Sequence, residues 1–138
     1  MKVLSTDFVL FLVCCAIFVS GCSKGDPVAP VSGTVTLQGK PIADCSITFQ
    51  PTAKNPIVAA FGLTDVNGKF SLETIESPKR KGAVAGEYQV KFFWRDPDFD
   101  ETKSKPAPYQ IPVKYQQEGI TFIVPNEGKT DVVFDLVP

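Results

Sequence analysis

Hydrophobic and polar residues alternate along several short segments that begin at residue 31. In the first segment, Val31, Gly33, Val35 and Leu37 alternate with serine and threonine. A period of two places successive side chains on opposite faces, so residues 31–37 are predicted to form a half-buried β-strand. The same alternation predicts six further strands, at residues 43–49, 59–63, 70–72, 87–94, 120–124 and 132–136.

The phase of the alternation predicts which side chains share a face. Cys45 is in phase with Ile47 and Phe49, which predicts a buried and inert thiol. In the strand at 87–94, Trp94 is in phase with the apolar positions, whereas Phe93 lies on the other face. In the strand at 59–63, one face carries Ala59, Phe61 and Leu63. Trp94 is therefore expected to have a packing role.

Turn residues separate the predicted strands. The sequence Asp65-Val66-Asn67-Gly68 predicts a tight hairpin turn, because asparagine and glycine tolerate positive φ. A proline-rich irregular segment is expected at 95–112, and 113–117 is the one candidate for a helical turn. Seven short strands at this spacing predict an all-β fold, a seven-stranded antiparallel β-sandwich of the immunoglobulin-like type.

The first 21 residues have the features of a cleaved signal peptide. Lys2 lies near the start, and an apolar run from Phe8 to Val19 ends in the small residues Ser20 and Gly21. A membrane-spanning helix needs about 20 apolar residues, so this run is too short to be one. The segment 1–21 is therefore predicted to direct export and to be removed.

The sequence Val19-Ser20-Gly21-Cys22 resembles the bacterial lipobox, the recognition sequence of lipoprotein signal peptidase. The resemblance implies a diacylglyceryl group on the Cys22 sulfur, cleavage before Cys22 and an N-acyl group on the new amino terminus. Several acyl chains anchor a protein more durably than one. The alternative is an ordinary signal peptide with a chance cysteine at its end. In the lipoprotein interpretation, residues 22–30 are expected to form a polar tether interrupted by prolines. Residues 31–138 are expected to form the folded domain.

The cysteine count limits the chemistry of the exported domain. Cys14 and Cys15 would leave with the signal peptide and Cys22 would carry lipid, so only Cys45 would remain as a thiol. One thiol forms no internal disulfide. The chain has no histidine, which removes the usual zinc ligands and the usual general base. We expect no enzymatic activity and no bound cofactor apart from the lipid.

The charge balance argues against a nucleic-acid partner. The chain has 14 lysines and arginines against 15 acidic residues, a net charge of −1. Such a balance provides no basic field for a phosphate backbone. The membrane, reached through the lipid anchor, is the first expected partner, and an envelope protein or a glycan is the second.

Four short motifs follow one another along the domain: Val31-Ser32-Gly33-Thr34-Val35, Gly39-Lys40-Pro41, Thr64-Asp65-Val66-Asn67-Gly68-Lys69-Phe70 and Gly86-Glu87-Tyr88-Gln89-Val90. In series they resemble the carboxypeptidase regulatory-like domains, which are related in fold to transthyretin and other prealbumin-like sandwiches. The segment from Ile111-Pro112 and Tyr115 to the last strand also resembles small bacterial lipoproteins built on this domain. The resemblance implies a prealbumin-like sandwich that acts as a non-catalytic module.

Three groups of residues outside the lipobox are candidates for binding. Trp94 and Phe93 are candidates for an aromatic platform beside the 95–112 segment. The carboxylates of Asp96, Asp98, Asp100 and Glu101 are weak candidates for a hard cation, against a solvated loop. The basic run 79–81 would contact anionic headgroups, or else form an exposed loop.

These observations predict a membrane-tethered, non-catalytic lipoprotein of the cell envelope, with a structural or protein-binding β-sandwich. The alternative is a carbohydrate- or peptide-binding module that uses Trp94 and the 95–112 segment. The domain is expected on the exported side of the membrane. Ser23, in place of aspartate after the lipidated cysteine, resembles the outer-membrane sorting signal of some bacteria.

Overall fold

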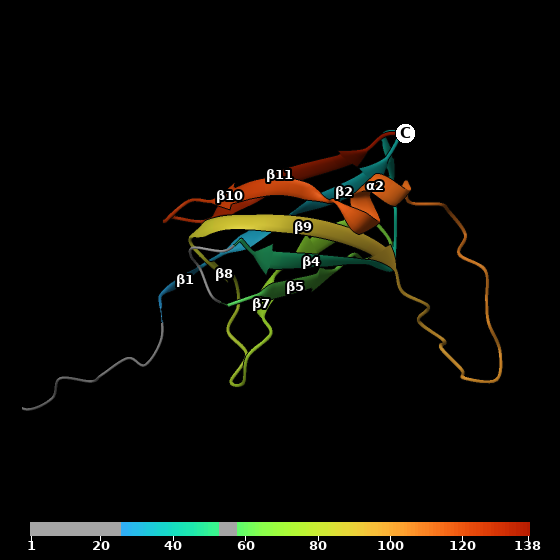
Figure 1. Cartoon of the computed structure of the whole chain (residues 1–138), viewed down its shortest axis with the longest axis horizontal. Helices are drawn as coiled ribbons and strands as arrows, with labels where there is room; N and C mark the ends of the chain where they lie inside the picture. The colour runs from blue at the N-terminus through green and yellow to red at the C-terminus, as the bar shows by residue number, and fades with distance from the viewer. Residues whose placement is uncertain (1–25, 53–57) are drawn as a thin grey trace, which may run out of the picture.

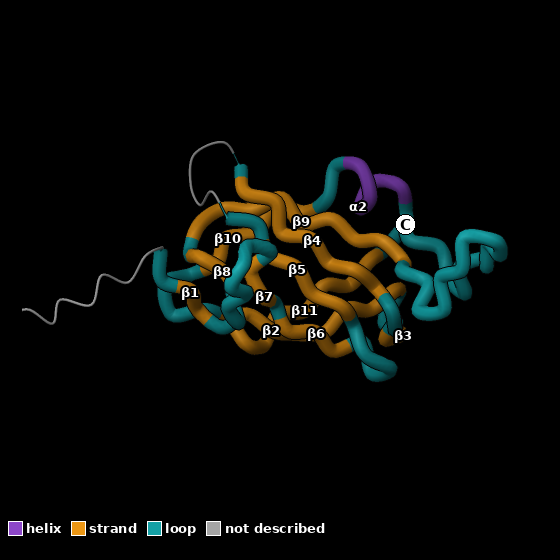
Figure 2. Tube along the Cα trace, turned by 90° about the horizontal axis from the view of Figure 1, so that it is seen from below, coloured by secondary structure: helices purple, strands orange, loops and turns teal. Residues whose placement is uncertain are grey.

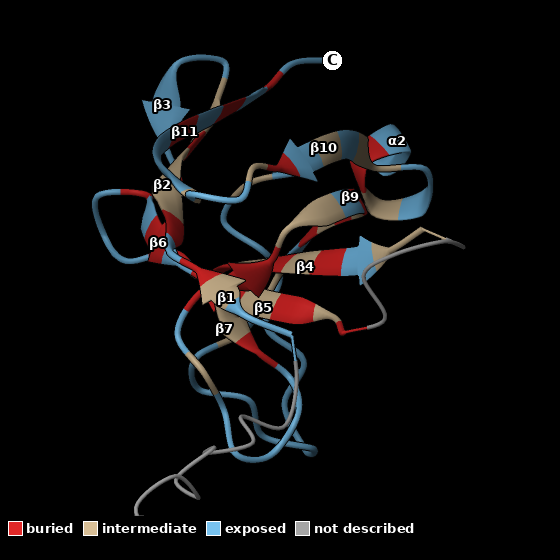
Figure 3. Ribbon diagram, turned by 90° about the vertical axis from the view of Figure 1, so that its left-hand side faces the viewer, coloured by how far each residue is buried: buried red, intermediate tan, exposed pale blue. Residues whose placement is uncertain are grey.

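The computed structural model describes residues 26–52 and 58–138, which form two facing β-sheets, a small β-ribbon and one short helix (Figure 1). In the end-on view of Figure 3, the red stretches of buried residues lie on strands of both sheets. This architecture confirms the predicted all-β sandwich. The predicted signal peptide, the lipobox and the first part of the tether lie outside the described residues.

The larger sheet has five strands, all paired antiparallel, in the order β10-β9-β4-β5-β7. Their bounds are β4 Cys45–Pro51, β5 Ala60–Leu63, β7 Glu73–Thr74, β9 Gly86–Trp94 and β10 Ile120–Val124. Strand β9 is the longest, with nine residues, and its inner face carries buried Tyr88, Val90 and Phe92. The predicted burial of that face is therefore confirmed over most of the strand.

The smaller sheet is built on β2, Val31–Leu37. The last strand of the chain, β11 (Lys129–Leu136), lies along one edge of β2, and β3 (Lys40–Pro41) and β6 (Lys69–Ser71) share the other edge. Strand β11 runs parallel to β2, so the prediction of a wholly antiparallel sandwich is wrong for this pair. The reason is that β10 belongs to the larger sheet and β11 to the smaller one. Strand β11 therefore does not form an antiparallel pair with the strand that precedes it.

Seven of the strands lie where the sequence pattern predicts strands, but the described residues contain eleven. The four additional strands have two residues each: β1 (Val28–Ala29), β3, β7 and β8 (Ala83–Val84). Segments of two residues are too short to show a period, which is why alternation missed them. The ribbon of β1 and β8 joins the end of the predicted tether, which we call the tether side of the chain, to the loop before β9. The predicted helical turn is confirmed as α2, Val113–Gln117.

Strand β5 presents its larger side chains to the outside of the sandwich. Its inner face carries Ala60 and Gly62, while Phe61 is partly exposed and Leu63 is 41% exposed. A Cβ built on Gly62 would lie 3.0 Å from a Leu72 methyl group. The chain between β6 and β7 therefore fills the space beneath β5, so that only small residues fit on the inner face.

The Asp65–Gly68 turn has the predicted geometry. One carboxylate oxygen of Asp65 accepts hydrogen bonds from the backbone N–H groups of Asn67, at 2.8 Å, and Lys69, at 3.0 Å. Gly68 has a φ of +74°, and a Cβ there would lie 2.6 Å from the Val35 carbonyl oxygen. Glycine is thus required both by the turn and by its contact with β2.

Phe134 of β11 is the centre of an aromatic cluster that joins the two sheets. Its ring centroid lies between 5.2 and 6.3 Å from the centroids of Phe92, Phe122, Phe70 and Phe49. These separations suit favourable edge-to-face and stacked contacts. The last strand thereby places one side chain against the inner face of the opposite sheet.

Gly33 allows β11 to approach β2. A Cβ at Gly33 would lie 1.9 Å from the carbonyl oxygen of Val132, beside the register shift between Lys129 and Val132. No rotamer change relieves a clash with backbone. The glycine in the first motif is therefore a packing requirement of the parallel pair.

We predict that Gly33→Ala lowers the free energy of unfolding by about 3 kcal/mol, because the added methyl group forces β11 away from β2. Urea denaturation followed by circular dichroism measures this. Gly39→Ala is the control: Gly39 has a φ of +80°, but open space surrounds its Cβ position, so only backbone strain of about 1 kcal/mol is expected. Equal losses for the two variants would contradict the close-approach explanation.

We also predict that Phe134→Ala lowers the free energy of unfolding by about 3–5 kcal/mol, since it removes a large buried ring from between the sheets. The neighbouring Val133 is 67% exposed, and Val133→Ala is expected to change stability by less than about 0.5 kcal/mol. Thermal unfolding of both variants is the measurement. A small loss for Phe134→Ala would show that the cluster does not hold the sheets together.

Candidate functional site

Trp94 is the last residue of β9, where the chain leaves the sheet and enters the 95–112 segment (Figure 1). It pairs in register with Cys45, whose side chain faces the core. The indole therefore lies on the inner side, as its phase predicts. It is only partly buried, however, because it stands at the end of the sandwich and not in its middle.

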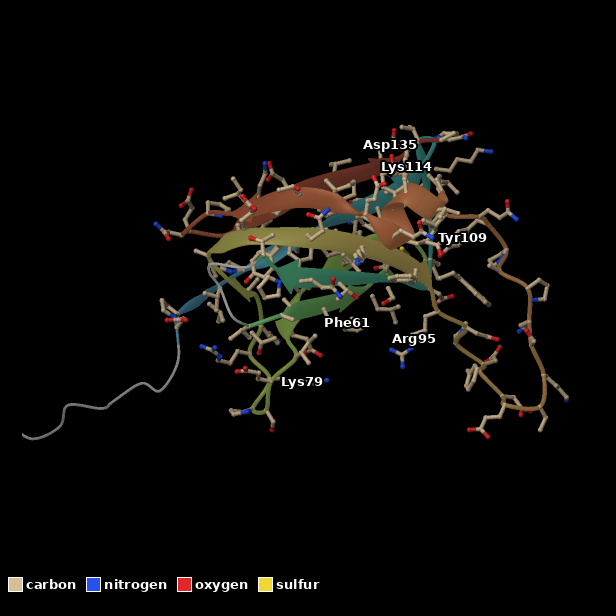
Figure 4. The ribbon with its side chains drawn as sticks, in the orientation of Figure 1. Phe61, Lys79, Arg95, Tyr109, Lys114 and Asp135 are labelled. Carbon is tan, nitrogen blue, oxygen red and sulfur yellow. The ribbon has the colours of Figure 1, made fainter. Side chains whose placement is uncertain are left out.

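The 95–112 segment returns to the sandwich beside Trp94. The Tyr109 hydroxyl donates a 2.5 Å hydrogen bond to the carbonyl oxygen of Ala43, and Ile111 is buried. Figure 4 shows Tyr109 at this end of the sandwich. Burial raises the pKa of Tyr109, so the phenol remains a donor at neutral pH. The segment is thus fixed at its second half.

Helix α2 continues from this segment and is fixed in turn to the core. The ring of Tyr115 packs edge-on against Phe92, with centroids 6.2 Å apart. Its hydroxyl oxygen accepts a 3.1 Å hydrogen bond from the backbone N–H of Val137. Helix α2, the end of β9 and the C-terminus therefore meet at one end of the molecule (Figure 2).

A hollow of about 590 Å³ lies between the end of β9, the returning segment and α2. Phe93, Trp94, Tyr109, Ile111 and Val113 provide its apolar walls. Phe93 is 41% exposed on the outer face, which confirms its predicted phase, and Val113 is 59% exposed. The volume is within the range of small-ligand sites, about 300–1,000 Å³. The structure thus brings Trp94, Phe93 and the 95–112 segment together, as the binding hypothesis requires.

The indole nitrogen of Trp94 is buried and has no hydrogen-bond partner among residues 26–52 and 58–138. A buried N–H without an acceptor costs about 1–3 kcal/mol. The Trp94 N–H is the only side-chain polar atom of the described residues in this condition.

A second hollow lies on the other side of Trp94. Asp44, Leu63, Arg95, Asp96 and Phe99 contribute to its lining, and its volume is about 690 Å³. Phe99 is 75% exposed. The Arg95 side chain extends away from the sandwich (Figure 4). This hollow is more polar than the first and carries charges of both signs.

The acidic residues of the 95–112 segment are engaged locally. Asp98 forms a 3.1 Å ion pair with Lys105, which raises the pKa of that lysine. Asp100 accepts hydrogen bonds from the backbone N–H and the hydroxyl of Thr102, which lower the pKa of its carboxyl group. Asp96 accepts the backbone N–H of Asp98. These bonds stabilise turns in an exposed loop.

Glu101 completes the acidic group that sequence reasoning considered for a cation. In the described part of the chain, no three histidine, cysteine or acidic side chains are arranged to hold a metal ion. Lysines 103 and 105 lie among Asp96, Asp98 and Asp100 and compete with a cation there. The geometry fits the alternative of a solvated loop.

The basic run 79–81 lies in the exposed loop that follows β7. Lys79 forms a 3.4 Å ion pair with Glu73, with both side chains exposed. Arg80 donates a 2.5 Å hydrogen bond to the backbone carbonyl of Asp26. The loop therefore contacts the tether side of the chain, at the opposite end from Trp94 (Figure 1).

Cys45 is fully buried in the core, which confirms the prediction from its phase. Burial raises the pKa of its thiol to about 12, although a backbone hydrogen bond at Phe93 partly opposes this. A nucleophilic cysteine needs the opposite shift. The thiol is therefore a packing group beside the site.

No family model, no curated protein and no solved structure matches this chain. In the described part of the chain, no helix has the length and apolar character needed to cross a bilayer.

The sequence pattern placed Tyr109 in the candidate site only as part of the 95–112 segment, and it did not identify Asp44 or Leu63. The alternation of Tyr109 and Ile111 around Gln110 was a signal for a returning, half-buried segment, but the prolines around it indicated irregular structure. Asp44 directly precedes β4, and Leu63 ends β5. Their position beside Trp94 depends on strand pairing, which local patterns do not contain.

We predict that stability declines between about pH 9 and pH 12, because Cys45 ionises in the unfolded chain before it ionises in the folded one. The folded thiol, with a pKa of about 12, keeps its proton over this interval while the unfolded thiol, near 9, loses it. The free energy of unfolding therefore falls by up to about 1.4 kcal/mol per pH unit, and below pH 9 the contribution is constant.

Urea titrations from pH 8 to pH 11 on the wild type and on Cys45→Ala measure this term. The variant should lose less stability over the interval than the wild type does. Tyr88, whose pKa burial raises to about 12, contributes to the alkaline loss in both proteins. Parallel curves for the two proteins would contradict the assignment to Cys45.

Proposed function

We propose that this chain is a membrane-tethered, non-catalytic lipoprotein of the cell envelope, whose β-sandwich acts structurally or binds another protein. The proposal starts from the lipobox-like sequence Val19-Ser20-Gly21-Cys22 and the apolar run before it. Acylation of Cys22 would anchor the mature chain on the exported side of a membrane. The fold is consistent with the non-catalytic sandwich modules that the sequence motifs resemble.

The main support for the proposal is the position at which the chain enters the sandwich. The tether side of the chain reaches the fold through β1 and the Arg80–Asp26 hydrogen bond, whereas Trp94 and the 95–112 segment lie at the opposite end (Figures 1 and 2). The nine residues of β9 correspond to about 26 Å between these ends. A lipid on Cys22, four residues before Asp26, would hold the first end near the membrane and leave the second facing away from it.

The state of the reactive side chains supports a non-catalytic role. The Cys45 thiol is buried with a raised pKa, and the Tyr109 hydroxyl is committed to the Ala43 carbonyl. Asp98 and Lys105 neutralise each other. An activated nucleophile needs an adjacent base or a lowered pKa, and these residues have neither.

A carbohydrate- or peptide-binding module is the second candidate. One observation favours it: Trp94 and Phe93 border a hollow of about 590 Å³ with exposed apolar walls. Aromatic side chains of this kind bind sugar rings and peptides. The two candidates are compatible, because a tethered sandwich needs a site to hold its partner.

We predict that the membrane-extracted protein begins at Cys22 and carries added acyl mass, and that Cys22→Ala abolishes both features. Intact-mass measurement with mapping of the amino-terminal peptide tests this. Cys45→Ala is the matched control, because a buried core thiol should carry no lipid and the variant should remain acylated.

An unmodified chain in the wild type would contradict the lipoprotein proposal. Acylation that persists in Cys22→Ala would do the same, since the lipid would then be attached elsewhere. The non-catalytic part fails separately, if the purified protein shows reproducible turnover of ester, peptide or glycoside substrates.

A further inference from the structure

We infer that strand β10 binds an extended, uncharged segment of a partner protein, which adds to the larger sheet as a further antiparallel strand. Strand β10 ends the strand order of this sheet, and β9 is its only ladder partner in the described part of the chain. Figure 3 shows β10 at the margin of the sheet. We call the side of Ile120–Val124 that faces away from β9 the β10 edge. The inference rests on the proposed protein-binding role and specifies the partner.

The ladder between β9 and β10 fixes which backbone groups face the partner strand. The Glu87 carbonyl accepts a 3.2 Å hydrogen bond from the Thr52 N–H, which lies on the β4 side of β9. Backbone groups of successive residues point to opposite sides of a strand, so those of Tyr88 point to β10. Tyr88 is in register with Phe122, and the backbone groups of Phe122 therefore point to β9.

Thr121 and Ile123 flank Phe122 and have the opposite orientation. Their N–H and C=O groups point to the β10 edge, away from β9. The Thr121 hydroxyl donates a 3.2 Å hydrogen bond to the side-chain oxygen of Gln89, which holds Thr121 on the outer face of the sheet. Ile123 lies on the same face and is 66% exposed. The β10 edge therefore offers two donors and two acceptors to an added strand.

Strand β10 lacks the features that protect the other sheet edges of residues 26–52 and 58–138. Edge strands are commonly protected by charge, proline, a bulge or shortness. Strand β11 carries three charged residues, Lys129, Asp131 and Asp135, and its register shifts near its start. Strands β3, β6 and β7 have only two or three residues. Strand β10 has five residues in regular register, and none of them is charged or a proline.

An added strand would also cover the inner side chains of β10. Ile120 and Phe122 point into the sandwich but are only partly buried, whereas Val124 is buried. The Phe122 ring centroid lies 5.6 Å from that of Phe134 and 5.7 Å from that of Phe49. Apolar side chains at alternate positions of the partner would extend this cluster and lose contact with water. The inner face thus favours a partner segment with alternating apolar residues.

The proposed anchor argues against a second copy of this chain at the β10 edge. An antiparallel copy would have all its strands reversed relative to the first. Its tether side would then lie at the Trp94 end of the first copy, about 26 Å along β9 from the tether side of the first. A membrane that holds one tether side would leave the other at that distance. A segment of a different protein has no such constraint.

The probe is a fluorescently labelled peptide of seven alternating valines and threonines, with a lysine at each end for solubility. It is titrated into the detergent-purified full chain, and fluorescence anisotropy should show saturable binding. Amide hydrogen exchange measured by NMR locates the contact. The amides of Thr121 and Ile123 should exchange readily in the free protein and gain at least about tenfold protection with the peptide.

Methylation of peptide nitrogens tests the pairing itself. With the valines on the inner face, antiparallel pairing turns the threonine N–H groups toward β10 and the valine N–H groups away from it. A peptide methylated at the threonine nitrogens should bind at least about tenfold more weakly, because it loses its ladder hydrogen bonds. Methylation at the valine nitrogens should change binding less than about twofold. The reverse order would contradict antiparallel pairing.

Two exposed apolar residues provide a matched pair of variants. Ile123→Lys, at the β10 edge, should weaken peptide binding about fivefold or more, because a lysine on an edge strand opposes the addition of another strand. Val133, on the outer face of the smaller sheet, is 67% exposed, and Val133→Lys should change binding less than about twofold. Circular dichroism confirms that both variants are folded before titration.

The inference is overturned if the peptide does not bind, or if Ile123→Lys and Val133→Lys bind it equally. A wild-type dimer in sedimentation that Ile123→Lys dissociates would replace the partner with a second copy. The intact mass of the same sample separates this inference from the proposed function. An acylated chain that does not bind the peptide counts against the inference alone. A chain that binds the peptide but carries no lipid on Cys22 counts against the lipoprotein proposal alone.

Discussion

The parallel pairing of β11 with β2 is the contact on which the rest of the sandwich depends. It brings the last strand of the chain beside the first long one, and it requires glycine at position 33 because the Val132 carbonyl occupies the space of a side chain. The same pairing places Phe134 against aromatic rings of the opposite sheet. Since β2 and β11 are separated by most of the domain's sequence, the smaller sheet is completed only when β11 pairs with β2, whereas the larger sheet contains no residue of β11.

The two hollows beside Trp94 are a consequence of where this core stops. The inner face of β9 is fully buried at Tyr88, Val90 and Phe92, and it becomes partly exposed at Trp94 because the sheets end there. The returning segment covers this end only in part. Tyr109 and Ile111 anchor it, so that the indole is left between two hollows instead of within the core.

Local alternation was sufficient to predict the seven longer strands, the Asp65 turn and the burial of Cys45, because each depends on residues adjacent in sequence. It could not predict that β11 runs parallel to β2, or that Phe61 faces outward, because both depend on which strand lies next to which. At the site, Trp94 and Phe93 were identified from their aromatic character and phase. Asp44 was missed because only the pairing of β4 with β9 brings it there.

The placement of the predicted tether and Trp94 at opposite ends of the sandwich has a mechanical consequence. If a partner held at Trp94 and a lipid anchor are pulled apart, the force enters the fold at β1 and β2 and leaves it at the end of β9, so it acts along the strands. Because β2 and β9 lie in different sheets, such a load passes between them through the packed core, and within each sheet it is shared by many ladder hydrogen bonds at once. Peeling β11 from an edge would break them one at a time. In the proposed arrangement, the sandwich would be loaded along its strands and not peeled from an edge.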